Sequence, residues 1–391
     1  MIDYGKILNP TVVNDIKPSG IRKFFDIAAT MDDVISLGVG EPDFPTPWHI
    51  RRAGMRSLEE NKTRYTSNSG IIELREEICN FLKRKYSLEY SGASEVLVTV
   101  GGSEGIDAAI RALVRHGDEV IIPQPSFVCY EPIVRLAGGV PVTIQLKAEN
   151  EFRLTADELR AAITDKTKLL VFPFPCNPTG AIMGREDVDA IAEVLRGTDI
   201  CVLSDEIYSE LTYGGVKHVS IASADGMRER TVVINGFSKT YSMTGWRMGY
   251  ACAPAPIIAQ MTKIHQFAIM SAPTTSQYAA IEAVKNGDGD IQKMLEEYDM
   301  RRRLMVGGFN KIGMSCFEPK GAFYAFPSVK ISGMDSENFC ETLLREKKVA
   351  LVPGNAFGES GEGFVRASYC YSTDHIKEAL SRIGDFLKEI K

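Results

Sequence analysis

The sequence predicts an α/β protein in which a mostly parallel sheet lies between helices, followed by a smaller α+β part. From residue 95 to about residue 253, short β-rich runs alternate with helical patterns, which is typical of a parallel sheet covered on both faces. After Pro256 the alternation stops, and a long helical pattern at 289–309 suggests a connector between two lobes. At 391 residues the chain is also long for one domain.

The individual elements follow from apolar spacing and from turn residues. Before residue 95 the patterns predict a short helix at 21–29, a strand at 35–39, and helices at 48–62 and 73–86. The large sheet is expected from strands at 96–100, 119–123, 140–146, 168–172, 200–204, 231–235 and 248–253, with helices ending near 114 and at 186–196. The C-terminal part is expected to hold strands at 321–326, 349–352 and 363–368 and helices at 337–347 and 373–390.

Composition narrows the range of partners. The net charge is −6 without a basic cluster, so we expect neither nucleic acid nor an anionic membrane surface as a partner. No apolar run approaches the length of a membrane span. Eight scattered cysteines indicate reduced thiols, and five dispersed histidines give little support to a metal site. The first residues show neither a signal peptide nor a presequence, so we expect a cytoplasmic protein.

Polar groups follow four of the predicted strands, at the strand ends where open α/β sheets bind ligands. Gly101, Gly102 and Ser103 begin a helix, and the free N–H groups there are suited to a phosphate, although a tight turn needs glycine equally. Asn177 follows the strand at 168–172 in an Asn-Pro-Thr-Gly run, which is either an ordinary turn or a hydrogen-bond donor to a ligand.

The third and fourth strand ends hold opposite charges. Asp205 follows the strand at 200–204, where it either caps a helix or pairs with a protonated ring nitrogen. Lys239 follows an apolar run, and its apolar and small neighbours favour a nucleophilic amine over a solvated charge. Arg247 offers a planar fork to a phosphate, with the Ser238 hydroxyl beside it.

The segment from Ser238 to Gly249 fits the pattern S-K-x5-G-x-R-x-G and resembles the pyridoxal-phosphate lysine segment of class I aminotransferases (fold type I). The resemblance covers nearly the whole chain, and the spacing of 28 residues between Asn177 and Asp205 matches the family. Residues 19–28 and 235–239 are most similar to archaeal-type aromatic and aspartate aminotransferases. The resemblance implies pyridoxal 5'-phosphate as cofactor and a seven-stranded sheet in a large domain at 46–290. The small domain would comprise 1–45 and 291–391.

The resemblance also implies catalytic roles. Lys239 would bind the cofactor covalently and move the Cα proton, and Asp205 would keep the ring nitrogen protonated. Tyr208 and Asn177 would contact the phenolate oxygen of the ring, and Phe127 would stack on the ring.

The remaining implied contacts concern the phosphate and the substrate. The phosphate would be held by Gly102, Ser103, Glu104, Ser238 and Arg247. Tyr65 would reach the phosphate of a neighbouring subunit, which implies a homodimer with shared active sites. Gly40, Asn177 and Arg366 would bind the substrate, with Arg366 holding its α-carboxylate.

The activity implied is transfer of the amino group of an aromatic or acidic L-amino acid to 2-oxoglutarate by a ping-pong mechanism. Two features depart from the family: Gly236 replaces a serine found in some relatives, and no second arginine is identifiable for an acidic side chain. An alternative with the same cofactor set is a carbon–sulfur β-lyase or an enzyme similar to aminocyclopropane-carboxylate synthase. A non-catalytic regulator joined to a DNA-binding module is disfavoured, because the chain begins almost directly with the predicted small domain.

Overall fold

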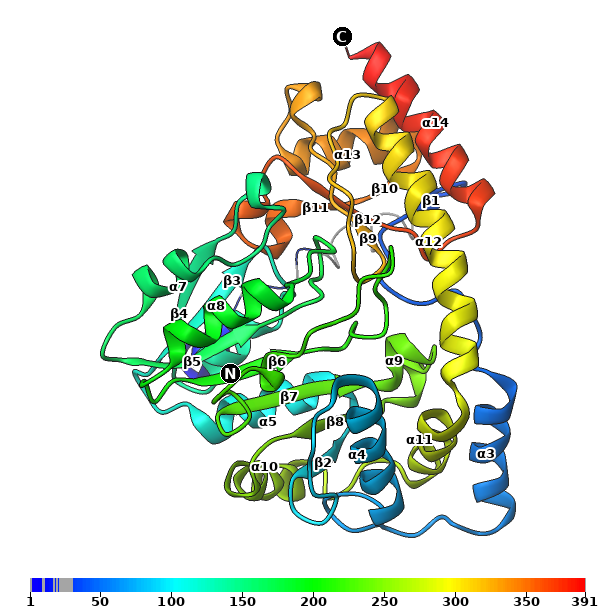
Figure 1. Ribbon diagram of the computed structural model, residues 1–391. Helices are drawn as coiled ribbons and strands as arrows, with labels where there is room; N and C mark the ends of the chain where they lie inside the picture. The colour runs from blue at the N-terminus through cyan, green and yellow to red at the C-terminus, as the bar shows by residue number, and fades with distance from the viewer. Residues whose placement is uncertain (1, 9–10, 17, 19, 21–30, 391) are drawn as a thin grey trace.

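The computed structural model describes residues 2–8, 11–16, 18, 20 and 31–390 (Figure 1). The helix predicted at 21–29 therefore lies outside the described residues. Within the described residues, no helix combines the length and the apolar character needed to cross a membrane.

A seven-stranded sheet forms the centre of the larger part of the molecule. Its strand order is β2-β8-β7-β6-β5-β3-β4. Every neighbouring pair is parallel except the two that involve β8. The strands are β2 (Val96–Thr99), β3 (Glu119–Gln124), β4 (Val140–Gln145), β5 (Thr167–Phe172), β6 (Cys201–Asp205), β7 (Thr231–Gly236) and β8 (Gly249–Cys252). The predicted mostly parallel, seven-stranded sheet is confirmed.

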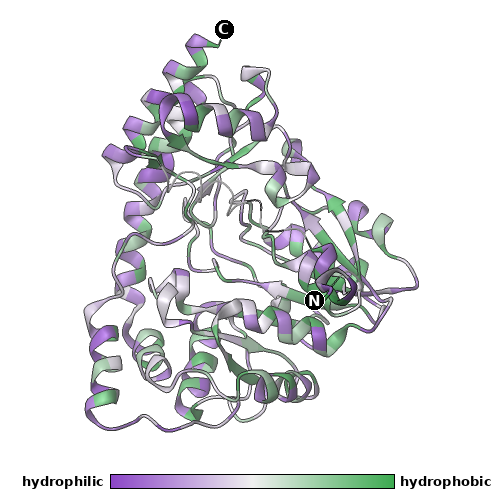
Figure 2. Ribbon diagram, turned by 180° about the vertical axis from the view of Figure 1, so that it is seen from behind, coloured by the Kyte–Doolittle hydropathy of each residue, from purple (hydrophilic) through white to green (hydrophobic). Residues whose placement is uncertain are grey.

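Helices cover both faces of this sheet because successive residues of each strand point to opposite sides. Val232 and Ile234 of β7 pack with the helices of one face, whereas Val233 packs with those of the other. One face carries α5 (Gly101–Leu113), α6 (Tyr130–Leu136) and α10 (Ala255–Ala268); α4 (Ile72–Tyr86), α7 (Ala156–Ala162), α8 (Arg185–Leu195) and α11 (Thr274–Asn286) lie on the other. Figure 2 shows that the helices alternate hydrophilic and hydrophobic residues, as expected for helices buried on one side.

The smaller part of the fold holds a three-stranded antiparallel sheet in the order β11-β12-β9. Its strands are β9 (Tyr324–Ala325), β11 (Val352–Pro353) and β12 (Val365–Ser368). A separate parallel pair joins β1 (Ile35–Ser36) to β10 (Val349–Ala350), which ties the N-terminal segment to the C-terminal part. This pairing agrees with a small domain built from both ends of the chain, and the boundaries at 46 and 291 stay a prediction.

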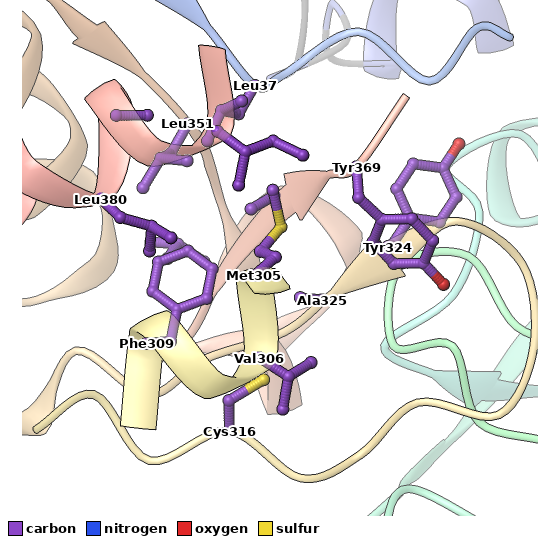
Figure 3. Close-up of a cluster of buried hydrophobic side chains, with 14 of the residues drawn as sticks. Leu37, Met305, Val306, Phe309, Cys316, Tyr324, Ala325, Leu351, Tyr369 and Leu380 are labelled. Carbon is purple, nitrogen blue, oxygen red and sulfur yellow. The ribbon is translucent and has the colours of Figure 1, made fainter. Parts of the chain in front are cut away.

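Helices α13 (Ser336–Lys347) and α14 (Thr373–Glu389) complete the smaller part at the top of Figure 1, together with the C-terminal half of α12 (Asp288–Lys311). Met305 and Phe309 of α12 pack against Leu37, Leu351 and Leu380 in one apolar cluster (Figure 3). Because α12 also contacts α11 of the larger part, it is the long connector that the sequence predicts.

Helix α3 (Trp48–Glu59) corresponds to the helix predicted at 48–62. Four helices have no counterpart among the predicted elements, namely α6, α7, α10 and α11. α6 and α7 have seven residues each, too few for a clear apolar period, and α11 is rich in alanine. The strand expected at 349–352 is divided into β10 and β11, which pair with different partners on either side of Leu351. Helices α1 (Tyr4–Leu8) and α9 (Phe237–Thr240) are short.

Candidate active site

A cavity of about 320 Å³ opens at the carboxyl ends of β2, β5, β6 and β7. It gathers residues from segments far apart in the sequence, including β9 and β12 of the smaller part. Of the predicted site residues, the cavity is lined by Gly40, Gly102, Ser103, Phe127, Asn177, Asp205, Tyr208, Ser238, Lys239, Arg247 and Arg366. Glu104 and Tyr65 are not among the lining residues.

Lys239 lies on α9, directly after the buried strand β7. Its Nζ donates a hydrogen bond to the Gly40 carbonyl oxygen at 2.7 Å, and it forms no ion pair with any described residue. Burial lowers the pKa of the Lys239 ammonium to about 8, because a charge loses its hydration there. Lowering the pKa enlarges the neutral fraction of the amine near neutral pH, and the neutral form is the nucleophile.

Asp205 ends strand β6 and is buried. Its Oδ2 accepts a hydrogen bond from the Tyr130 hydroxyl at 2.6 Å, and its Oδ1 accepts one from the Ile207 N–H at 3.2 Å. Burial raises the pKa of Asp205 to about 6, although both hydrogen bonds act in the opposite direction. Tyr130 also lines the cavity, and sequence reasoning missed it because its partner is 75 residues away.

Two glycine positions let the start of α5 approach Arg247 and strand β8. Gly101 has a φ of +76°, and a Cβ on it would lie 2.5 Å from Arg247 Nη2. A Cβ on Gly249 would lie 2.5 Å from the Gly101 carbonyl carbon. Arg247 Nη1 donates to the Thr244 carbonyl oxygen at 3.0 Å, and the guanidinium has no carboxylate partner among the described residues. The start of α5 and the unpaired guanidinium of Arg247 together form a site suited to an anion such as phosphate.

Glu104 does not line the cavity, and its carboxylate is occupied by other partners. It accepts hydrogen bonds from the Val100 N–H and from the ring of the buried His265. Any contact of Glu104 with a phosphate would therefore come from its backbone N–H, and that contact stays a prediction.

Arg366 is buried on β12, and its hydrogen-bond partners are far from it in the sequence. Its Nη1 donates to Asn177 Oδ1 at 2.9 Å, and its Nη2 donates to the Gly38 carbonyl oxygen at 2.6 Å. Its Nε is buried and has no partner in the described chain. The guanidinium lines the cavity and has no carboxylate partner among the described residues, so it is suited to bind the carboxylate of a ligand.

Tyr324 of β9 contacts two other residues of the cavity wall, Arg366 and Tyr208. Its ring centroid lies 4.5 Å from the guanidinium carbon of Arg366, and its hydroxyl lies 2.9 Å from that of Tyr208. A Cβ on Gly40 would lie 2.1 Å from the Tyr324 hydroxyl oxygen, so glycine is needed for this close approach. The sequence offered no signal for Tyr324 beyond an alternating apolar run.

Phe127 and Tyr65 are placed very differently. Phe127 lines the cavity and meets Tyr130 edge to face, with ring centroids 6.1 Å apart. Tyr65 is 82% exposed and lies outside the cavity of its own chain.

A family model described as "Aminotransferase class I and II" matches residues 32–383. The chain is 46% identical to an aspartate aminotransferase of Pyrococcus abyssi, over 96% of this chain and 97% of that one. It is 42% identical to aromatic-amino-acid aminotransferase 2 of Thermococcus litoralis, with the same coverage. The crystal structure of an aromatic aminotransferase from Pyrococcus horikoshii superposes with a TM-score of 0.90, at 43% identity, over 94% of this chain and 99% of that one.

Proposed function

Because the chain belongs to the class I and II aminotransferases, which depend on pyridoxal phosphate, we propose that it moves the amino group of an aromatic or acidic L-amino acid to 2-oxoglutarate. The observation that carries the proposal is that Lys239 and Asp205 line one cavity while neither is paired with an opposite charge in the described chain. Burying two such groups without an opposite charge is costly even when they are hydrogen-bonded, so a bound partner of both is expected.

The residues of the cavity fit this cofactor. Gly102, Ser103, Ser238 and Arg247 offer hydrogen-bond donors and a positive charge to its phosphate. Phe127 offers an aromatic face to its ring. The side-chain oxygen of Asn177, Oδ1, accepts a hydrogen bond from Arg366. The side-chain NH₂ group of Asn177 is therefore left to donate to the phenolate oxygen.

When bound, pyridoxal phosphate supplies an aldehyde that reacts with amines and a ring that accepts the electron pair of the Cα–H bond. The Lys239 amine, with its pKa lowered to about 8, would take up the proton from Cα and deliver it to the cofactor carbon instead of back to Cα. The Asp205 carboxylate, positioned by Tyr130, would keep the ring nitrogen of the cofactor protonated. The Arg366 guanidinium, held in place by Asn177 and the Gly38 carbonyl oxygen, would orient the α-carboxylate.

The choice of donor amino acid is supported by relatives named for aspartate and for aromatic amino acids. Both half-reactions would use the same site in turn, which gives a ping-pong mechanism. Within the described residues, Arg247 and Arg366 are the arginines that line the cavity. With Arg247 engaged by the phosphate and Arg366 by the α-carboxylate, neither of these arginines is left to pair with an acidic side chain of the donor.

We also propose a cytoplasmic homodimer whose two active sites are shared. The support is the position of Tyr65, which is exposed and lies outside its own cavity. An exposed tyrosine of this kind can reach the phosphate site of a second copy, and its hydroxyl is a suitable donor there.

The test is a single-turnover panel. Holoenzyme is mixed with one amino acid at a time, and the visible absorbance of the cofactor is followed while the 2-oxo acid is identified by mass spectrometry. We expect aromatic or acidic donors to react fastest and 2-oxoglutarate to restore the original absorbance with release of glutamate. Pyruvate and ammonia from a sulfur-containing amino acid, without glutamate, would show a lyase instead. The Lys239→Ala variant serves as the inactive control.

A further inference from the structure

The Glu104 carboxylate, at the start of α5 but outside the cavity, has a buried histidine as its partner. His265 Nδ1 lies 2.5 Å from Glu104 Oε1, and the His265 side chain is fully buried. The second ring nitrogen, Nε2, is buried and has no hydrogen-bond partner within the described chain. The hydrogen bonding of this side chain is therefore directed at Glu104.

Glu104 lies where its charge affects anion binding. It is in the first turn of α5, next to Ser103 and close to Gly102, both of which line the cavity. The free N–H groups and the positive end of a helix attract any nearby anion, so a mobile carboxylate here competes with a phosphate for the same donors. In the structure its Oε2 instead accepts a hydrogen bond from the Val100 N–H, at the end of the preceding strand.

The histidine is itself firmly held. It is on α10, which packs against α5 through Ile258 and Met261 of one helix and Ile106 and Ala109 of the other. A side chain fixed in such packing presents its donor in one place, so the carboxylate is held by two hydrogen bonds from two separate elements.

We propose that His265 is a positioning residue for the cofactor phosphate. By holding the Glu104 carboxylate against Val100, it keeps the N–H groups at the start of α5 free for the phosphate. The inference rests on the proposed use of α5 as the phosphate site. His265 does not line the cavity and takes no part in the bond-breaking steps.

The experiment compares two vitamers, pyridoxal phosphate and pyridoxal, which differ only in the phosphate. Full-length protein is freed of cofactor and titrated with pyridoxal phosphate or with pyridoxal, and cofactor absorbance gives each Kd. His265→Leu removes the donor, and we expect the Kd for pyridoxal phosphate to rise about tenfold while the Kd for pyridoxal changes by less than about twofold. His265→Asn keeps an N–H donor near the position of Nδ1 and is expected to stay within about threefold of the wild type.

A double variant separates charge from packing. In His265→Leu combined with Glu104→Gln the competing charge is gone, so most of the affinity for pyridoxal phosphate should return. Equal weakening of both vitamers by His265→Leu, or an unchanged Kd for pyridoxal phosphate, would overturn the inference. If His265→Leu does not fold, His265→Phe, which keeps an aromatic ring but has no N–H donor, is measured in its place with the same expected results. Equal wild-type affinity for the two vitamers would instead refute the phosphate site itself.

Discussion

Replacing Lys239 by methionine should stabilise the cofactor-free protein at pH 7. The pKa of this ammonium falls from its usual 10.5 to about 8 in the folded protein, so the unfolded chain holds the proton more tightly. At 1.36 kcal/mol per pKa unit, the buried charge costs about 3 kcal/mol of folding free energy. The lost hydrogen bond to the Gly40 carbonyl offsets about 1 kcal/mol, which leaves a net gain of about 2 kcal/mol.

The direction of the pKa shift of Lys239 determines the pH range in which the destabilisation is present. The destabilisation is fully present below about pH 8 and disappears as the pH rises from about 8 to 10.5, because the folded protein then loses the proton first. For a chain of this length, about 2 kcal/mol corresponds to a rise in Tm of roughly 2–3 °C. Differential scanning calorimetry of the cofactor-free wild type and Lys239→Met variant, at pH 7 and near pH 10, measures this difference in Tm. A variant that is less stable at pH 7, or an advantage that does not shrink at high pH, would refute the reasoning.

Three further predictions concern catalysis. Asp205→Asn should lower kcat about 100-fold or more while the cofactor stays bound, because a neutral amide cannot hold the ring nitrogen protonated; a loss below tenfold in steady-state assays would contradict this. Arg366→Lys keeps the charge but not the planar fork, so kcat/KM for the amino acid should fall about 10- to 100-fold with an unchanged cofactor spectrum; an unchanged kcat/KM would place the carboxylate elsewhere. Tyr130→Phe removes the hydroxyl that donates to Asp205 and should lower kcat about tenfold, whereas the same rate in both proteins would show that this bond is dispensable.

Sequence reasoning selected many of the residues that line the cavity, because these residues follow strands with strong local patterns. The run before Lys239 is continuously apolar and β-branched, and the segment after it matches a family pattern in both residue type and spacing. Asp205 and Asn177 were found in the same way, Asp205 at the end of one buried strand and Asn177 shortly after another. The structure brings all three into one cavity.

What the sequence did not predict depends on long-range contacts. Tyr130 becomes part of the site through a bond to Asp205, and Tyr324 through contacts with Tyr208 and Arg366. None of these contacts leaves a local pattern. The two-residue strands of the smaller part are set by pairing between distant segments, which explains why the strand expected at 321–326 is reduced to β9.

The most direct test of the account is the site of covalent attachment of the cofactor. Holoenzyme is reduced with borohydride, digested, and analysed by mass spectrometry. The account predicts that the added mass of reduced pyridoxal phosphate is found on Lys239 and disappears in the Lys239→Ala variant. Attachment to a different lysine, or no attachment in an active enzyme, would contradict it.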